Sequence, residues 1–278
     1  MKSFIGCSLI FLSLSVFAAI PDPVNPDPNT PRPIDAVETP FIEEMTWMEV
    51  RDALREGKTT ILISTGGIEQ NGPYLVTGKH NIVLKATTRA IAEKLGNTLI
   101  APIIPFVPEG NISPATEHMR YPGTVSVTEE TFQRLITEVC QSFKQHGFKH
   151  LILIGDSGGN QAGMKAVAEK LADEWKEGET RIDYIPEYFN WRECGEFLKS
   201  KGIVETSEGL HDDASISSIM ATIDPQSIRL EQRRKAGLAR INGVSFDPPS
   251  RAVEIGNMVI EFRANATVEA IKKRLSRL

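Results

Sequence analysis

The sequence predicts an α/β protein whose fold is a three-layer α/β/α sandwich around a mainly parallel central sheet. Two observations support this prediction. Short aliphatic and β-branched runs alternate with longer amphipathic segments along residues 59–189. Several of the short runs are apolar throughout, which indicates strands that are buried on both faces between layers of helices. The amphipathic segments then supply the helical crossovers that parallel strands require.

The first elements of this alternation are a strand, a helix and a second strand. The run "TTILIST" (59–65) is rich in β-branched residues and predicts a strand. Apolar residues at helical spacing follow over 81–96 and predict a helix. Strand character returns over 97–107, where prolines interrupt it.

A long amphipathic helix is predicted next, over 126–147, where Ser126 and Glu129 have the spacing of a capping box. The pattern then predicts a strand, a helix and a strand, over 149–155, 160–178 and 180–189. From about Ser207 onward the chain reads as loop and helix. It ends in a helix, over 254–278, that we expect to pack on the body of the domain.

The N-terminal 40 residues are predicted to lie outside the folded domain. Residues 1–19 combine a basic residue, a short apolar run and small residues, which is the pattern of a secretory signal peptide. Residues 20–40 hold seven of the 17 prolines and are expected to form an extended linker. We therefore expect one domain over 41–278, in a secreted or periplasmic protein with no stable membrane insertion after cleavage of the signal peptide.

Composition and charge narrow the class of protein. The chain has 278 residues with 41% hydrophobic residues, enough for one large buried core. Its net charge is −5 and it has no long basic run, so no nucleic-acid partner is expected. Cys140 and Cys194 are expected to be buried free thiols, although an oxidising compartment permits a disulfide between them.

Ligands of parallel α/β sheets bind beyond the carboxyl ends of the strands. The turn after the first strand, over 66–81, holds Glu69 and His80, a carboxylate and an imidazole that can ligate a divalent metal. By spacing alone, a solvated glutamate and a surface histidine are the default interpretation of these two residues. The turn "IGDSGGN" (154–160) adds Asp156 as a candidate ligand.

The same glycine-rich turn supports a different interpretation. Ser157 lies in a formal G-x-S-x-G match on a strand-to-helix turn, the position of a hydrolase nucleophile. A triad would then use Asp183 or Asp212 together with His211. The turn lacks the lysine of a P-loop and the three-glycine pattern of a dinucleotide site.

Two later segments also carry titratable side chains. Residues 208–220 concentrate one histidine and two carboxylates, which suit a metal, a general base or the acidic start of a helix: His211, Asp212 and Asp213. Residues 108–124 place His118 and Arg120 in a proline-broken loop that is long for a plain connection.

Four motifs in a fixed order run from about residue 43 to the C-terminus. They are "GGIEQNGPYLVTGKHN", "EHMRYPGTVSV", "HGFKHLILIGDSGGNQ", and "NGVSFDP" followed by "EIG". On these motifs the chain resembles the creatininase family of metal-dependent amidohydrolases. The resemblance implies a creatininase-like fold, hydrolysis of a C–N bond in a small-molecule amide, a divalent metal, and a homo-oligomer, with hexamers common in the family.

The metal-ligand positions depart from the family pattern. The family's glutamate is kept as Glu69, its histidine two residues later is Asn71, and its following aspartate is His80. The family's histidine in the glycine-rich turn is Ser157, with Asp156 beside it. Because histidine and aspartate have changed places rather than given way to apolar residues, we expect a rearranged metal site.

The rearranged site gives each candidate residue a role. The expected metal ligands are Glu69, His80, Asp156 and Asp213. Zinc is favoured, and manganese or iron are the alternatives. The expected catalytic residues are His211, Asp212, His118 and Arg120. The expected substrate-binding residues are Tyr74, Asn71, Ser157 and Trp191. Two alternatives stay open: a metal-free serine hydrolase that uses Ser157, and a catalytically inactive small-molecule-binding homologue.

Overall fold

The computed structural model describes residues 24–276, so the signal peptide predicted over residues 1–19 lies outside the described part of the chain. Within residues 24–276 the central sheet has four parallel strands in the order β2-β1-β3-β4: β1 (Thr60–Thr65), β2 (Thr98–Ile100), β3 (His150–Gly155) and β4 (Arg181–Tyr184). Strands β1 and β3 pair along their whole length, and Thr65 lies opposite Gly155. Their carboxyl ends therefore finish side by side.

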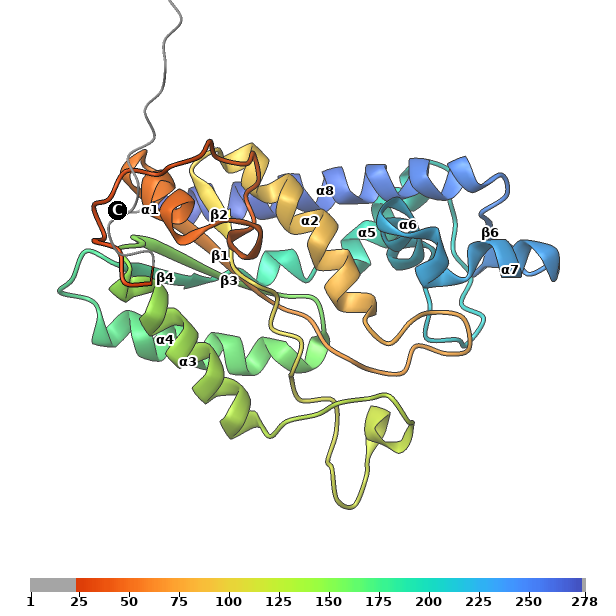
Figure 1. Cartoon of the computed structure of the whole chain (residues 1–278). Helices are drawn as coiled ribbons and strands as arrows, with labels where there is room; N and C mark the ends of the chain where they lie inside the picture. The colour runs from red at the N-terminus through yellow and green to blue at the C-terminus, as the bar shows by residue number, and fades with distance from the viewer. Residues whose placement is uncertain (1–23, 277–278) are drawn as a thin grey trace, which may run out of the picture.

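Helices cover both faces of this sheet (Figure 1). Two pack on each face: α3 (Glu129–Gln145) with α4 (Gln161–Glu174), and α2 (Lys79–Leu95) with α8 (Pro249–Leu275). The side chains of β1 alternate between the two layers. Ile61 and Ile63 join the core under α3 and α4, whereas Leu62 joins the core under α2 and α8. The predicted three-layer sandwich with a parallel sheet is confirmed.

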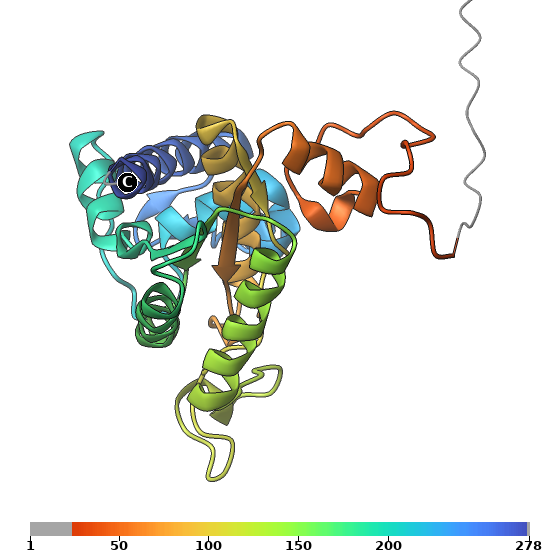
Figure 2. The same cartoon turned by 90° about the vertical axis from the view of Figure 1, so that its left-hand side faces the viewer.

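The other elements flank the sandwich. They are α1 (Trp47–Arg55), α5 (Trp191–Ser200), α6 (Ala214–Ile223), α7 (Leu230–Lys235) and the small hairpin of β5 (Arg240–Ile241) and β6 (Val244–Ser245). Helix α6 packs along α8 and also contacts α2. The connection between β2 and α3 extends away from the sheet on the side opposite α8, as both views show (Figures 1 and 2).

Three predicted boundaries differ from the structure, each for a local reason. The strand predicted over 97–107 ends at Ile100, because prolines at 102 and 105 cannot donate to a ladder. The strand predicted over 180–189 ends at Tyr184, and a short 3₁₀ turn begins at Pro186. The helix predicted to be capped by Ser126 is capped two residues later. Its cap is Thr128, whose hydroxyl accepts a hydrogen bond from the Thr131 backbone N–H.

The proline-rich segment over residues 24–40 forms no helix or strand, but it is fastened to α1. The guanidinium of Arg51 donates to the backbone carbonyls of Pro28 and Thr30, and Arg32 lies 3.4 Å from Asp52. Between residues 24 and 276 no helix is long and apolar enough to cross a bilayer. Cys140 and Cys194 are buried and unbonded, as expected.

Candidate metal centre

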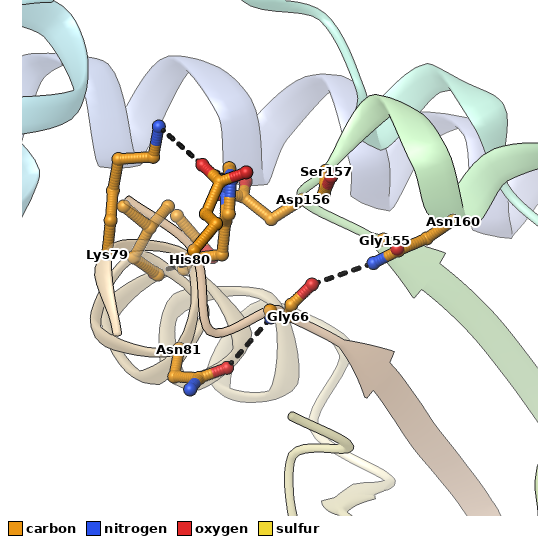
Figure 3. A network of polar contacts seen from close by, with 12 residues as sticks. Gly66, Lys79, His80, Asn81, Gly155, Asp156, Ser157 and Asn160 are labelled. Atoms are coloured by element: carbon orange, nitrogen blue, oxygen red, sulfur yellow. Dashed lines mark hydrogen bonds and ion pairs between the residues drawn. The ribbon is translucent and has the colours of Figure 1, made fainter. Parts of the chain in front are cut away.

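The candidate site forms where β1 and β3 end, because the turns that follow these strands are tied together. The side-chain amide of Asn160 donates to the carbonyl of Gly66 at 2.8 Å, which joins the two turns (Figure 3). Asn81 accepts a hydrogen bond from the Gly67 backbone N–H at 3.2 Å. A Cβ atom at Gly66 would lie 1.9 Å from the Asn81 side-chain oxygen, so this close approach requires glycine.

Glu69 is the central carboxylate of the site. Its side chain is buried, and its Oε1 atom lies 3.0 Å from both Lys79 Nζ and His80 Nε2. Burial by itself disfavours the charged form, but the hydrogen bonds from His80 and Lys79 and their charges hold the pKa of Glu69 well below its ordinary value. Glu69 is therefore an ionised carboxylate at neutral pH.

His80 lies between two carboxylates at the start of α2. Its side chain lies next to Asp156 (Figure 3), with Nδ1 2.7 Å from Asp156 Oδ2, and its Nε2 atom lies 3.0 Å from Glu69 Oε1. Burial favours the neutral imidazole, but the hydrogen bonds to Asp156 and Glu69 raise the pKa of His80 overall. Because both ring nitrogens already contact carboxylates, His80 is a buried cation in this arrangement rather than a free ligand.

Arg263 in α8 pairs with Asp156 and ends this series of charged contacts, and sequence reasoning missed it. Its guanidinium lies 2.9 Å from Asp156 Oδ1 and is fully buried between the rings of Tyr188 and Trp191, at 4.2 and 3.8 Å. Burial opposes ionisation of Asp156, but the charge of Arg263 and the hydrogen bond from His80 lower its pKa. The one signal in the sequence was an arginine within the apolar pattern of the last helix.

Two histidines from other loops complete a group that can hold a metal ion. His118 Nε2 lies 3.3 Å from Glu69 Oε2, and His211 Nε2 lies 3.9 Å from Glu69 Oε1. Each of the three side chains offers one ligand atom, and these atoms lie within 4.8 Å of one another. The two imidazole rings stack with their centroids 5.0 Å apart.

Gln70 contacts both of these imidazoles, but it favours the metal-binding tautomer of His211 alone, because its side-chain amide N–H donates toward His118 Nδ1. Its backbone carbonyl accepts from His211 Nδ1 at 3.3 Å, and its side-chain amide lies 3.4 Å from His118 Nδ1. A proton on Nδ1 of His211 leaves the lone pair of Nε2 facing Glu69, which is the tautomer that binds a metal. Burial and the nearby charge of Lys79 also lower the pKa of His211, which favours the neutral ligand form.

One glutamate and two histidines are the protein ligands of many catalytic zinc sites, and they leave a coordination position open. The donor set and the tautomer of His211 therefore fit one divalent metal ion. The residues predicted as ligands are placed differently. Glu69 belongs to the group, whereas His80 and Asp156 are joined to each other. Asp213 lines the nearby pocket, where its Oδ1 atom accepts a hydrogen bond from Asn242 at 3.2 Å.

Two of the predicted catalytic residues, Asp212 and Arg120, do not belong to the candidate metal group. Asp212 is buried, and its Oδ2 atom pairs with Arg233 at 3.0 Å, so its position is structural. Arg120 is exposed and donates to the backbone carbonyl of Glu117. The other two predicted catalytic residues, His118 and His211, are the imidazoles of the candidate metal group.

The predicted substrate-binding residues also divide into two pairs. Ser157 and Trp191 line a pocket of about 400 Å³ beside the candidate metal group. Tyr74 instead packs under the guanidinium of Arg233 at 4.3 Å. Asn71 is buried and donates to the carbonyl of Glu69 at 2.9 Å, so it shapes the turn. In the described part of the chain no histidine is hydrogen bonded to the Ser157 hydroxyl, which a serine nucleophile would need.

Glu109 is a further carboxyl group of this pocket that sequence reasoning missed. It is 4% exposed, and within residues 24–276 its Oε1 atom has no hydrogen-bond partner. Burial and the neighbouring charge of Glu69 raise its pKa to about 8. Glu109 therefore carries a proton at neutral pH, and a group in this state can exchange a proton with a substrate.

Fold and site together define a class of protein: an α/β/α sandwich with a candidate metal centre and a small pocket at the carboxyl ends of its parallel strands. The family model for creatininase, described as creatinine amidohydrolase, matches residues 43–274. The chain therefore belongs to the creatininase family and is a creatininase-family amidohydrolase.

Relatives and solved structures agree with this assignment. The mycofactocin precursor peptide peptidase of Mycolicibacterium smegmatis is 22% identical over 226 residues, which are 77% of this chain and 84% of that protein. A structure described as "Creatininase Mn" has a TM-score of 0.63 at 16% identity, covering 85% of this chain and 99% of the other. A mutant creatininase of "Zn-Zn type" has a TM-score of 0.61 at 17% identity, with coverage of 86% and 99%. The two solved structures show that this chain shares their fold.

Proposed function

We propose that this chain is an exported hydrolase that cleaves a C–N bond in a small amide with one divalent metal ion, zinc by its donor set. Glu69, His118 and His211 would hold the ion. The observation that carries the proposal is that ligand atoms of these three residues, which come from three separate loops, lie within 4.8 Å of one another beside a pocket. Export is inferred from the signal-peptide pattern over residues 1–19.

A bound divalent ion of this kind polarises a carbonyl group and lowers the pKa of water toward neutrality. The residues of the chain have supporting roles. His80 holds Glu69 in its ionised form, and Asp156 with Arg263 fixes the position of His80. These contacts restrict the carboxylate to one orientation in the site.

Glu109 is the group of the pocket that we assign to proton transfer. Its carboxyl lies beside Glu69 and, in the described structure, has an oxygen without a hydrogen-bond partner. Protonation of the leaving nitrogen completes cleavage of an amide, and a carboxylic acid in the pocket can supply that proton. Trp191, Phe189 and Ile216 line the same pocket and offer an apolar surface to the substrate.

The size and chemistry of the pocket favour a small amide or the end of a peptide. A volume of about 400 Å³ is at the low end for small-molecule sites. The family description, creatinine amidohydrolase, and the peptidase name of the mycobacterial relative both refer to C–N bond cleavage. Within residues 24–276 the serine-hydrolase alternative has no supporting contact at Ser157.

Metal analysis of the purified protein tests the proposal. We expect about one zinc ion per chain after reconstitution, and loss of this ion in His118→Ala and His211→Ala. His146→Ala is the matched control, because His146 is an exposed histidine at the end of α3 and lines no part of this pocket. A panel of linear amides, cyclic amides and dipeptides should show turnover that chelation abolishes and zinc restores. Unchanged metal content in both variants, or turnover that survives chelation, contradicts the proposal.

A further inference from the structure

The ammonium group of Lys79 occupies a position between two of the candidate metal ligands. Its Nζ atom lies 3.0 Å from Glu69 Oε1 and 3.4 Å from His211 Nε2. Lys79 is 1% exposed, so this contact is held inside the protein rather than at its surface. The ligand atoms that would face a metal ion therefore already face a positive charge that the chain itself provides.

We propose that Lys79 is an internal cation that competes with the metal ion for Glu69 and His211, so that the metal binds only when the ammonium group is displaced. This inference rests on the proposed metal site at Glu69, His118 and His211. It adds a regulatory feature to that site, because the metal-free state is then a stable, charge-paired state of the protein.

Charge pairing around the site supports this competition. Besides the two candidate ligand histidines, the carboxylates of Glu69 and Asp156 contact Lys79, His80 and Arg263. A divalent ion that bound while Lys79 stayed in place would put like charges a few ångströms apart in a buried site, where screening by water is weak. His80 and Arg263 are fixed by Asp156, so Lys79 is the member of the three that can leave.

The pocket beside Lys79 contains another carboxylate, that of Asp213, with which a displaced ammonium group can pair. The side chain of Lys79 has four rotatable methylene bonds and borders the same pocket as Asp213. Asp213 is exposed, precedes α6 and carries a carboxylate that can accept the displaced ammonium. Asp213 was expected from the sequence to be a metal ligand, and this arrangement gives it a different role, as the acceptor of the released lysine.

Zinc titration of the whole protein by isothermal calorimetry tests the competition. Lys79→Met keeps the length and apolar stem of the side chain and removes the charge, so zinc should bind about tenfold more tightly or better than in the wild type. Lys79→Arg keeps the charge and should bind no more tightly than the wild type. Lys85→Met is the matched control, because Lys85 is an exposed lysine of the same helix, and its zinc affinity should equal that of the wild type.

The outcomes separate this inference from the proposed function. Equal zinc affinity in wild type and Lys79→Met overturns the competition, even if the metal site exists. Zinc binding by Lys79→Met but not by the wild type supports the competition and overturns metal use by the natural protein. Absence of zinc binding in both overturns both ideas. If Lys79→Met does not fold, Lys79→Gln replaces it, and it too must bind zinc more tightly than Lys79→Arg.

Discussion

Replacing Glu109 with glutamine removes a buried carboxyl group whose protonation depends on the folded structure. The pKa of Glu109 rises from its ordinary value of 4.5 to about 8, because the group is buried and because Glu69 beside it is negatively charged. Each pKa unit corresponds to ~1.4 kcal/mol, so the difference between the two states is ~5 kcal/mol at most. Glu109 therefore carries more of its proton in the folded protein than in the unfolded chain between pH 4.5 and about 8.

The sign of the effect follows from this excess of bound protons. Stability falls as pH rises wherever the folded state binds more protons than the unfolded state. The wild type should lose a few kcal/mol of unfolding free energy between about pH 5 and pH 9 that Glu109→Gln keeps, because glutamine does not titrate. Near pH 5 the side chain of Glu109 is neutral in the folded wild type, as glutamine is in the variant, so the unfolding free energies of the two proteins should differ least. Near pH 9 the variant should have the larger unfolding free energy.

Urea unfolding of the metal-free protein in chelator, followed at several pH values, measures this difference. Glu93→Gln is the control, because Glu93 is an exposed glutamate of α2 and should follow the wild-type pH dependence. Parallel stability curves for the wild type and Glu109→Gln would refute the reasoning, since they would show that Glu109 titrates alike in both states. The same variant should also reduce amide turnover by ~10²-fold or more if Glu109 transfers the proton.

Three further predictions concern residues that the structure reassigns. Arg263→Met should lower the free energy of unfolding in urea by ~3–5 kcal/mol, because it leaves Asp156 as a buried charge without its guanidinium; a loss well under 1 kcal/mol would contradict the buried pair. Asp212→Asn should destabilise the fold in the same assay through Arg233 but leave the zinc content unchanged, and a variant that lost zinc would return Asp212 to the site. A fluorophosphonate reagent should leave Ser157 unlabelled in intact-protein mass spectra, whereas a stoichiometric adduct on this serine would favour the serine-hydrolase alternative.

The sequence by itself determined the layers and the edge of the sheet where the site lies. Solid apolar runs such as 149–155 require burial on both faces, and helices between parallel strands leave few arrangements for the chain. Polar, glycine-rich turns after two of these strands then placed Glu69 and Asp156 at the same edge. These features are local patterns whose physical requirement does not depend on the rest of the molecule.

Sequence also identified most members of the site without identifying their partners. Glu69, His118 and His211 were all candidates, but one was expected to be a ligand and two were expected to be catalytic. Their loops are far apart in the chain, and motif order gives no distances between side chains. The tertiary structure decided that their ligand atoms lie within 4.8 Å of one another.

Only the tertiary structure decided the protonation states and the charge pairs. His80 and Asp156 looked like two ligands, and they became a pair because α8 brings Arg263 to Asp156 from 107 residues away. Lys79 lies in the turn predicted over 66–81 and had no role assigned from the sequence, and it became a buried cation because Glu69 and His211 fold around it. Pairing and burial set the charge of a side chain, and both depend on neighbours that the linear sequence does not reveal.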